Sequence, residues 1–421
     1  MKRIQTCGAM TLGVSIVLIV LYATLNLENS NSHNPVGVDT SKHPSIHVRD
    51  RDLKNQSKRE NVAAPLSFVH NVSVSADFRE SIPQNGAYWN RLLYSALSNL
   101  DQGGNPFSQP SECKETNKEL LQTNIHDFNS YPLLFQSFLQ WMNCRSPAVL
   151  INQPDKCMFS EGGSKNPAFF LFAIKSTPGN FEQRQAVRET WGQERVLNGL
   201  GVRVLFLLGR SSPDDPDLSS LLSYEAKHFG DILQWDFLES FLNLTLKMNA
   251  FLHWAVKHCP HASFVFSGDD DVFVNTPVLV KYLQSLEADK ISKLYVGHAI
   301  SQSSPLRDPK SKYYIPLSFY DGAYPSYAGG GGFLFSGALL KSLRSVFHII
   351  PFFPIDDAYT GMCFKALGVS LEGHTGFQTF DIRAEDRENL CAYKELILVH
   401  QRSPQEIKKL WNGSHNPLLT C

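Results

Sequence analysis

The sequence has almost no net charge, and we find no clustered run of basic residues in it. Its 39 Lys and Arg residues balance 40 Asp and Glu residues, which leaves a formal net charge of -1. A nucleic-acid partner requires a basic patch or stripe, so this class of partner is excluded. No internal repeat is visible either. The 421 residues, of which 43% are hydrophobic, favour one large or two fused domains with a buried core.

One long uncharged run lies near the N-terminus, from Ile4 to Leu27, directly after Lys2 and Arg3. It is long enough to cross about 30 Å of hydrocarbon as a helix. The alternative is a cleaved signal peptide, whose apolar stretch is usually about 7–15 residues and ends in small residues. Residues 23–26 make a poor cleavage site. The sequence therefore predicts a cytosolic tail at residues 1–6, a transmembrane signal anchor at 7–27 and a lumenal remainder, because basic residues stay in the cytosol.

Sequons and cysteines agree with a lumenal location. Four N-x-S/T tripeptides, each weak evidence alone, occur at Asn55, Asn71, Asn243 and Asn412. Beyond the anchor, cysteines occur at positions 113, 144, 157, 259, 363, 391 and 421. On the lumenal side they would lie in an oxidising compartment. Seven is an odd number, so one cysteine is free or pairs with another chain. Their spacing does not give the connectivity.

The lumenal part divides by composition. Residues 28–80 are polar and rich in Ser, Asn, His and Lys, which predicts a flexible stem. Residues 81–165 carry an expected helix at Tyr88–Leu100 and three cysteines, and we interpret them as an N-terminal cap. Residues 166–421 alternate short apolar runs with helical patterns. This alternation predicts an α/β catalytic domain with a largely parallel sheet.

Within that domain the apolar periodicity predicts individual elements. Strands are expected at Phe169–Ile174, Val202–Leu208, Phe264–Phe266, Leu294–Val296, Phe333–Phe335 and Leu396–His400. Helices are expected at Phe181–Trp191, Leu244–His258, Pro277–Glu287 and Ala338–Val346. Thr276 is the expected N-cap of the third helix, with Pro277 at the first helical position. Ser403 to Glu406 has the form of a capping box.

The strongest local signal for chemistry is a triplet of carboxylates, Asp269 to Asp271, between two apolar runs. Adjacent carboxylates in a buried place repel one another unless a cation compensates. In an extended chain Asp269 and Asp271 point to the same side. Oxygen ligands of this kind suit Mg²⁺ or Mn²⁺. The pattern therefore predicts a metal site, with an acidic surface turn as the alternative.

A nucleotide crevice is expected after the first strand, at Lys175 and Ser176, because ligands of open α/β sheets bind beyond the carboxyl ends of strands. Arg184 and Arg188 are four residues apart on the next helix and share a face, from which they could reach a diphosphate. A solvated helix face, balanced by neighbouring glutamates, explains the same pair. Spacing alone does not choose between these interpretations.

Three further features complete the candidate site. Four glycines at residues 329–332 favour a packed loop that faces a cleft over a flexible surface loop, because glycine lets backbone approach closely. Asp356 and Asp357 begin an expected helix, where one can serve as N-cap and the second is a candidate general base. His400 ends the last strand, and its imidazole could complete a metal shell, although a structural role is the alternative.

At these residues the sequence resembles the β1,3-glycosyltransferase family, which includes β1,3-galactosyltransferases and β1,3-N-acetylglucosaminyltransferases. The resemblance extends from about Gln153 to Cys421, and more loosely back to Tyr88. Its motifs are RQAVRETWG at residues 184–192, NLTLK at 243–247, the Asp triplet, YAGGGGF at 327–333 and PIDDAYTGM at 354–362. The glycine loop and the Ile-Asp-Asp form resemble the N-acetylglucosaminyltransferase branch, above all the enzyme type that extends poly-N-acetyllactosamine.

The resemblance implies a GT-A type nucleotide-diphospho-sugar transferase fold, a Rossmann-like mixed sheet flanked by helices, behind a Golgi membrane anchor of single-pass type II. It also implies Mn²⁺ or Mg²⁺ and UDP-N-acetylglucosamine as donor, with inversion at the anomeric carbon. By position, the family's metal ligands are Asp269, Asp271 and His400, and its base is Asp357. Its nucleotide or donor contacts are Lys175, Arg184, Arg188, Lys247 and Asp270.

The resulting hypothesis is transfer of N-acetylglucosamine to the 3-hydroxyl of a terminal galactose on a glycoprotein or glycolipid. Two alternatives stay open. One is a β1,3-galactosyltransferase that uses UDP-galactose, and the other is a non-catalytic glycan-binding protein of the secretory pathway. The acceptor chain and assembly into homo- or hetero-oligomers are not fixed by the sequence.

Overall fold

A computed structural model describes residues 72–104, 113–158 and 169–421, which belong to one compact unit. The predicted tail and anchor, and the stem up to residue 71, lie outside the described residues. In the described part, no helix combines the length and apolarity needed to span a membrane. Ala76–Ser81 forms helix α2, whose Phe78 is buried and whose N-cap residue bonds to Ala366. Folded structure is therefore present before residue 81, the predicted start of the cap.

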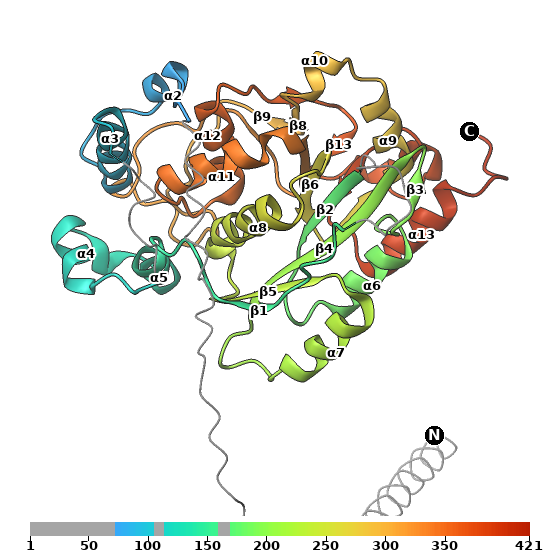
Figure 1. The fold of residues 1–421 in the computed structure, drawn as a ribbon, viewed down its shortest axis with the longest axis horizontal. Coiled ribbons are helices and arrows are strands. Elements are labelled where there is room, and N and C mark those ends of the chain that lie inside the picture. Colours follow the sequence, from blue (N-terminus) through green and yellow to red (C-terminus); the bar gives the residue numbers. More distant parts are fainter. Residues whose placement is uncertain (1–71, 105–112, 159–168) are drawn as a thin grey trace, which may run out of the picture. The chain divides into compact units, whose positions relative to one another are not determined.

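A mixed sheet forms the centre of the described unit (Figure 1). Its strand order is β1-β5-β4-β2-β6-β11-β8-β12, with β3 beside β4. Strands β5, β4, β2 and β6 are parallel, whereas β11 runs antiparallel to both β6 and β8. The expectation of a largely parallel sheet is therefore confirmed for these four strands and wrong around β11 and at β1 and β3, which pair antiparallel with β5 and β4. The strands of this sheet are β1 Val149–Ile151, β2 Phe169–Lys175, β3 Val196–Leu197, β4 Leu200–Arg210, β5 Ile232–Leu238, β6 Phe264–Asp269, β8 Tyr295–Gly297, β11 Gly332–Ser336 and β12 Glu372–Gly373.

Two small sheets lie beside the main one. The first has the order β13-β14-β7, and the second pairs β9 with β10. Their strands are β7 Val272–Val274, β13 Phe377–Gln378, β14 Leu398–His400, β9 Ala299–Ile300 and β10 Tyr327–Ala328. Because β7 follows β6 after a two-residue turn, the first small sheet continues directly from the end of the central strand.

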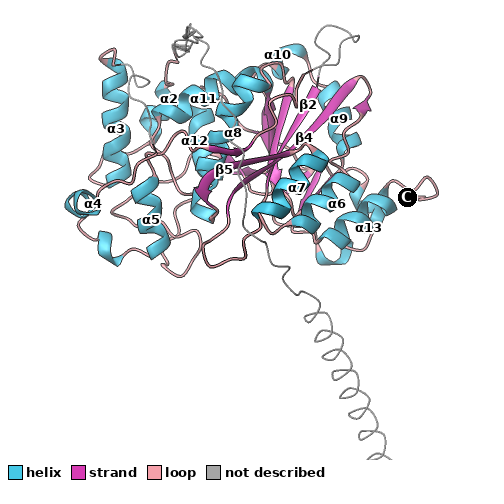
Figure 2. Ribbon diagram, turned by 60° about the horizontal axis from the view of Figure 1, so that its bottom comes forward, coloured by secondary structure: helices cyan, strands magenta, loops and turns pink. Residues whose placement is uncertain are grey.

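Helices cover both faces of the main sheet (Figure 2). Strand β2 is buried along its whole length, and alternate residues enter different cores, as expected when successive side chains point to opposite faces. Phe169 and Leu171 pack with α8, α11 and α12, whereas Phe170 and Phe172 pack with α6, α9 and α13. The helices are α2, α3 Tyr88–Asp101, α4 Lys118–Asn124, α5 Leu133–Trp141, α6 Phe181–Glu189, α7 Ser219–Phe229, α8 Leu244–His258, α9 Thr276–Gln284, α10 Ala288–Ile291, α11 Leu340–Ile349, α12 Asp356–Ala366 and α13 Pro404–Ser414.

Short 3₁₀ turns and helix caps complete the chain. The turns are η1 Phe128–Ser130, η2 Phe241–Asn243, η3 Gly337–Leu339, η4 Ala384–Asp386 and η5 Leu390–Tyr393. The capping box of Ser403 and Glu406 on α13 is confirmed. Asn275, rather than the predicted Thr276, caps α9, because its side chain accepts from the Val278 N–H. The Thr276 hydroxyl instead donates to the Trp191 carbonyl across the core.

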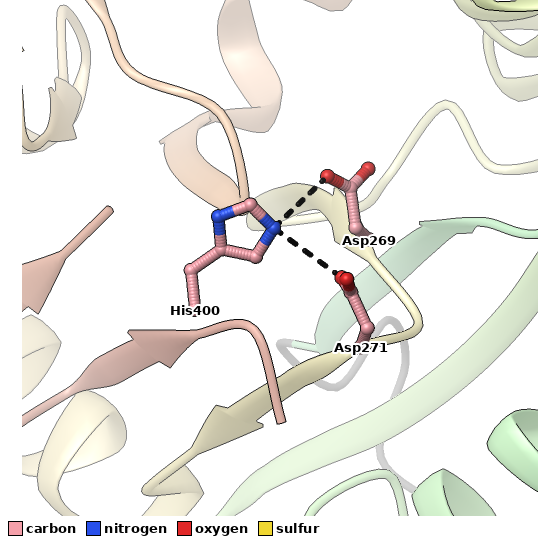
Figure 3. Close-up of side chains that lie close together, drawn as sticks. All are labelled: Asp269, Asp271 and His400. Atoms are coloured by element: carbon pink, nitrogen blue, oxygen red, sulfur yellow. Dashed lines mark ion pairs between the residues drawn. The ribbon is translucent and has the colours of Figure 1, made fainter. Parts of the chain in front are cut away.

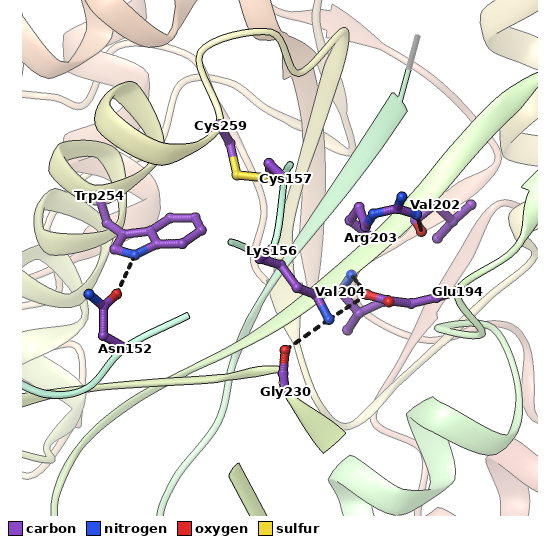
Figure 4. Close-up of a disulfide and its surroundings, with 10 residues drawn as sticks. All are labelled: Asn152, Lys156, Cys157, Glu194, Val202, Arg203, Val204, Gly230, Trp254 and Cys259. Atoms are coloured by element: carbon purple, nitrogen blue, oxygen red, sulfur yellow. Dashed lines mark hydrogen bonds and ion pairs between the residues drawn. A yellow bond between two sulfur atoms is a disulfide. The ribbon is translucent and has the colours of Figure 1, made fainter. Parts of the chain in front are cut away.

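One of three disulfides joins the N-terminal cap to the end of α8. The described cysteines form the pairs Cys113–Cys144, Cys157–Cys259 and Cys391–Cys421, and the buried Cys363 is free, which is the odd cysteine that the count requires. Figure 4 shows the second pair beside Lys156, whose ammonium contacts the Gly230 carbonyl at 3.0 Å and Glu194 at 2.7 Å. The end of the cap is thus fixed to α8 and to the β3–β4 hairpin.

Candidate active site

Three predicted metal ligands lie together at the end of the central strand. Asp269 is the last residue of β6 and Asp271 immediately precedes β7, which pairs with β14. His400 is the last residue of β14 and lies opposite Val272. One ligand atom from each of Asp269, Asp271 and His400 lies within 4.8 Å of the others. In Figure 3 the His400 Nε2 points at both carboxylates, 3.4 Å from Asp271 Oδ1 and 4.0 Å from Asp269 Oδ2.

The chemistry of this cluster fits a divalent cation. The His400 Nδ1 lies 3.0 Å from the Thr379 carbonyl oxygen, an acceptor, so the Nδ1 atom carries a proton. In the neutral ring, Nε2 then presents a lone pair toward the carboxylates, and Asp271 Oδ1 is buried without a hydrogen-bond partner. Burial lowers the pKa of His400, but the two carboxylates outweigh burial and raise it. Two carboxylates and an imidazole held by a backbone carbonyl are suitable ligands for Mn²⁺ or Mg²⁺.

Lys175 connects this cluster to the start of α12. It ends β2, and its ammonium lies 3.1 Å from Asp269 Oδ1 and 3.0 Å from Asp356 Oδ2. Burial lowers the pKa of Lys175, but the surrounding carboxylates outweigh it and raise that pKa well above its ordinary value. For Asp269 burial acts in the other direction and raises the pKa, but the charges of Lys175 and His400 outweigh burial and lower this pKa overall. Both groups are therefore charged at neutral pH.

Asp356 and Asp357 are neighbours with different surroundings. Neither caps α12, since the N-cap is Ile355 and no side chain bonds there, so the expectation that one of them serves as N-cap is wrong. Asp356 accepts a hydrogen bond from Lys175, whereas Asp357 Oδ1 is buried without a partner. Burial, and next the charge of Asp356, raise the pKa of Asp357 well above its ordinary value. A carboxyl group with a raised pKa is suited to accept a proton near neutral pH.

The glycine loop packs against Asp357 and His400. A Cβ at Gly330 would lie 2.9 Å from Asp357 Oδ2, and one at Gly331 would lie 2.9 Å from His400 Cγ. Gly331 also has φ +88°, a conformation that side chains rarely adopt. The Gly331 carbonyl accepts from the Asp269 N–H. The loop is therefore packed in the site, as predicted, and only glycine allows this approach.

A cavity of about 440 Å³ opens beside these residues. Asp357, His400 and Gly330 lie in its wall together with aromatic side chains, among them Tyr313, Tyr324, Tyr327 and Phe380. Phe380 is 74% exposed. Exposed aromatic rings beside a few polar groups are typical of pockets that bind small organic ligands. The aromatic wall was not predicted from the sequence, because its residues follow no local period.

Four of the five predicted nucleotide contacts adjoin the turn at residues 176–180, directly after β2. Arg184 donates to the carbonyls of Thr177 and Pro178, and Lys247 donates to the Ser176 carbonyl at 2.6 Å. Asp270 accepts from the Ser176 hydroxyl at 2.6 Å and from Asn180 at 3.0 Å. Burial raises the pKa of Asp270 to about 6. Lys175, described above, is the residue that precedes the turn.

Arg188 does not contact this turn. It shares a helix face with Arg184, as predicted, but it pairs with Asp231 and Glu225, both at 2.7 Å. Glu225 also pairs with Arg184, which is fully buried. The solvated-face interpretation of the arginine pair is therefore wrong, and contact with a diphosphate stays a prediction. Glu225 and Asp231 were missed because they lie on α7 and before β5, far away in the sequence.

An acidic cluster at the carboxyl end of a central strand, beside a cavity with a buried carboxyl group, defines an α/β enzyme site. Residues 182–375 match the galactosyltransferase family model. The chain is 44% identical over 350 residues to mouse N-acetyllactosaminide β1,3-N-acetylglucosaminyltransferase 2, a match that covers 80% of this chain and 86% of the relative. The mouse acetylgalactosaminyl-O-glycosyl-glycoprotein β1,3-N-acetylglucosaminyltransferase is 42% identical, with 70% and 76% covered. Human UDP-GlcNAc:betaGal β1,3-N-acetylglucosaminyltransferase 8 is 38% identical, with 83% and 86% covered.

The chain therefore belongs to the galactosyltransferase family of glycosyltransferases, among relatives that are named β1,3-N-acetylglucosaminyltransferases, and the family resemblance is confirmed. A solved glycosyltransferase involved in glycosylation of the PBCV-1 major capsid matches 58% of this chain and 98% of its own, at 14% identity and a TM-score of 0.30. That likeness is too weak to carry an argument.

Proposed function

We propose that this chain is an inverting, metal-dependent transferase of the GT-A type, which moves N-acetylglucosamine from UDP-N-acetylglucosamine to the 3-hydroxyl of a terminal galactose. The names of the relatives support the donor, the linkage and the galactose acceptor. One structural observation carries the proposal. His400, a member of the cluster with Asp269 and Asp271, and Asp357, whose Oδ1 is buried without a hydrogen-bond partner, line the same cavity.

In the proposed reaction Asp357 takes the proton from the galactose 3-hydroxyl. That oxygen forms a bond to the anomeric carbon from the face opposite the diphosphate, the bond from this carbon to the phosphate oxygen breaks, and UDP leaves. The α-linked donor thus gives a β product. The difference between the two neighbouring acids supports this role, because Lys175 pairs with Asp356, whereas Asp357 Oδ1 is buried without a hydrogen-bond partner.

Asp269, Asp271 and His400 would hold the cation. When bound, Mn²⁺ or Mg²⁺ supplies charge neutralisation to the leaving diphosphate. The cluster's own contribution is orientation. The Thr379 carbonyl fixes the His400 ring, and Lys175 keeps Asp269 ionised.

Lys175, Arg184, Lys247 and Asp270 would serve the nucleotide through the turn at residues 176–180. Three of them bond to this turn, so each can position its backbone for the nucleotide without touching it. Asp270 also keeps a carboxyl group close to the expected ribose or sugar of the donor. Arg188 would act more indirectly, since it holds Glu225 beside Arg184.

The cellular setting is part of the proposal. The apolar run at residues 4–27, the sequons and the three disulfides support a single-pass type II protein of the Golgi membrane with a lumenal catalytic domain. In that orientation the described unit would meet galactose-terminated glycans on glycoproteins or glycolipids.

A donor comparison tests the function. Purified full-length protein would be incubated with Mn²⁺, N-acetyllactosamine and either UDP-N-acetylglucosamine or UDP-galactose, and the product linkage would be determined by NMR. The proposal expects β1,3-linked N-acetylglucosamine, with UDP-galactose used far less. Preferred transfer of galactose would establish the sister activity instead, and glycan binding without UDP release would indicate a non-catalytic protein.

A further inference from the structure

Two of the four aromatic residues in the cavity wall, Tyr313 and Tyr324, come from one long loop, residues 301–326. This loop connects β9 to β10, and each of these strands has two residues. Tyr313 and Tyr324 reach the cavity from it, together with Ser303, Ser304 and Leu306. Its regular structure is limited to one isolated bridge, between Leu306 and Tyr314. Loops of this length in folded domains need support from elsewhere or serve a function.

The back of this loop is held by the N-terminal cap through the backbone. The Tyr88 N–H donates to the Ser318 carbonyl at 2.8 Å, and the Trp89 N–H donates to the Phe319 carbonyl at 2.7 Å. In addition, the side-chain amide of Asn90 donates to the Asp321 carbonyl at 2.9 Å. These three cap residues are consecutive at the start of α3, so one helix end fixes the loop at three points.

A series of side-chain hydrogen bonds joins the same segment to the two residues that flank η1. The Ser318 hydroxyl donates to Asp127 Oδ2 at 2.6 Å, and the Tyr131 hydroxyl lies 2.6 Å from the Ser318 oxygen. Since the serine proton is used on the carboxylate, Tyr131 is the donor in the second bond. A hydrogen bond to an ionised carboxylate is about twice as strong as a neutral one. Asp127 therefore acts through Ser318 and Tyr131 together.

Aromatic packing continues this contact toward the cavity. The ring of Phe135 on α5 lies edge to face with Phe319, centroids 5.1 Å apart, and 6.4 Å from Tyr314. Tyr314 is the neighbour of Tyr313, whose own ring meets Phe241 at 5.2 Å. The cap thus contacts Tyr314, the neighbour of Tyr313 in the cavity wall. The ring of Tyr313 itself meets Phe241, which does not belong to the cap.

We infer that the cap, through Asp127, Ser318 and Phe135, positions the loop at residues 301–326 and thereby sets the affinity for the acceptor sugar. The inference rests on the proposed function, because it takes the aromatic cavity beside Asp357 as the acceptor site. Asp127 and Phe135, the two cap residues of this set, lie outside the stretch that matches the family model, residues 182–375, whereas Ser318 lies within it. They are positioning residues, since none of them lines the cavity.

The test separates acceptor binding from donor binding. Ser318→Ala, Asp127→Ala and Tyr131→Phe would be made in the full-length protein, with Asp101→Asn as control. Asp101 lies in the cap and pairs with Arg79 at the surface. KM for N-acetyllactosamine and for UDP-N-acetylglucosamine, kcat and Tm would be measured for each. Ser318→Ala and Asp127→Ala are expected to raise the acceptor KM about tenfold, as for the loss of one bond to a charged group, with the donor KM unchanged.

Conservative variants distinguish positioning from general destabilisation. Ser318→Thr keeps the hydroxyl and should restore most of the acceptor affinity, and Asp101→Asn should leave both KM values unchanged. If Ser318→Ala and Asp127→Ala lower Tm but leave the acceptor KM unchanged, or raise both KM values equally, the cap only stabilises the fold and the inference is wrong. If the wild type itself transfers no sugar, the proposed function fails, and this inference fails with it.

Discussion

His400 lies opposite Val272 in the antiparallel pair of β14 and β7, and this register places its imidazole 3.4 Å from Asp271. The pairing joins a residue near the C-terminus to a turn in the middle of the chain. A shift of the register by one residue would turn the imidazole to the other face of the sheet. The site therefore depends on the small sheet β13-β14-β7 as much as on the Asp triplet.

Removal of the proposed base gives the first prediction. Asp357→Asn should lower kcat by about 10²–10⁴-fold, the usual contribution of a general base, because asparagine cannot accept the acceptor's proton. Binding of UDP-N-acetylglucosamine, measured by calorimetry, should be retained. Asp289→Asn is the matched control, since Asp289 is exposed in the first turn of another helix, α10. Near-normal kcat for Asp357→Asn would exclude Asp357 as the base.

The pH dependence of activity gives the second prediction. Burial and Asp356 raise the pKa of Asp357, and a base must be deprotonated to work. Activity should therefore be lost as the pH falls through this raised value, at a pH above the ordinary aspartate pKa of about 4. The profile of log kcat/KM against pH measures it. An acid limb centred near pH 4 would indicate an unperturbed carboxyl group.

The raised pKa of Asp357 also predicts an effect on stability. Deprotonation of Asp357 should raise the activity but lower the free energy of unfolding. At a pH above this raised pKa, folding moves the ionised carboxylate of Asp357 out of water and into the buried site. Ionised Asp357 therefore lowers the free energy of unfolding. Asp357→Asn removes this charge and should raise Tm at neutral pH. The gain should disappear below about pH 4, where Asp357 is protonated in both states. Thermal unfolding between pH 3.5 and 7.5 checks the sign, and a lower Tm at pH 7 would contradict it.

The buried pair of Arg184 and Glu225 gives a prediction with a surface control. Glu225→Gln leaves two arginines without their shared carboxylate and should destabilise the protein by about 3–5 kcal/mol. Glu189→Gln removes the exposed partner of Lys408 and should cost less than about 1 kcal/mol. Urea unfolding of both variants compares them. Equal, small effects would show that the Arg184 network does not stabilise the turn at residues 176–180.

The glycine loop gives a prediction about metal affinity. Gly331→Ala should shift His400, because the new Cβ would lie 2.9 Å from its ring, and the concentration of Mn²⁺ for half-maximal activity should rise about 10–100-fold. Gly86→Ala is the control, since nothing lies within 4 Å of its Cβ position. A Mn²⁺ titration of activity measures both. An unchanged titration for Gly331→Ala would separate the loop from the metal cluster.

The local sequence predicted what local physics determines. Helix α8 begins and ends at the predicted residues, Leu244 and His258, and the core alternation of β2 follows from its continuous apolar run. The capping box at Ser403 is a local exchange of hydrogen bonds, and it is confirmed. The meeting of Asp269 and Asp271 was also predicted, but from an extended chain, whereas the structure places residues 270–271 in the turn between β6 and β7.

Contacts between distant segments were not predictable in this way. The cysteine spacing did not reveal which partner Cys157 takes, and the helical period placed Arg184 and Arg188 on one face without showing that Glu225 faces them. The aromatic residues of the cavity wall follow no period at all. Two of them lie on the loop at residues 301–326, which contacts the cap, for example through Asp127 and Ser318, and only the tertiary structure shows these contacts.

The dependence of UDP release on a divalent cation is the sharpest test of the proposed metal cluster. Full-length protein would be freed of metal with a chelator and assayed with UDP-N-acetylglucosamine and N-acetyllactosamine before and after addition of Mn²⁺, beside the Asp271→Asn variant. The account predicts that UDP release stops on chelation and returns with Mn²⁺ in the wild type but not at the same Mn²⁺ concentration in Asp271→Asn. Release that continues unchanged in the presence of the chelator would contradict it.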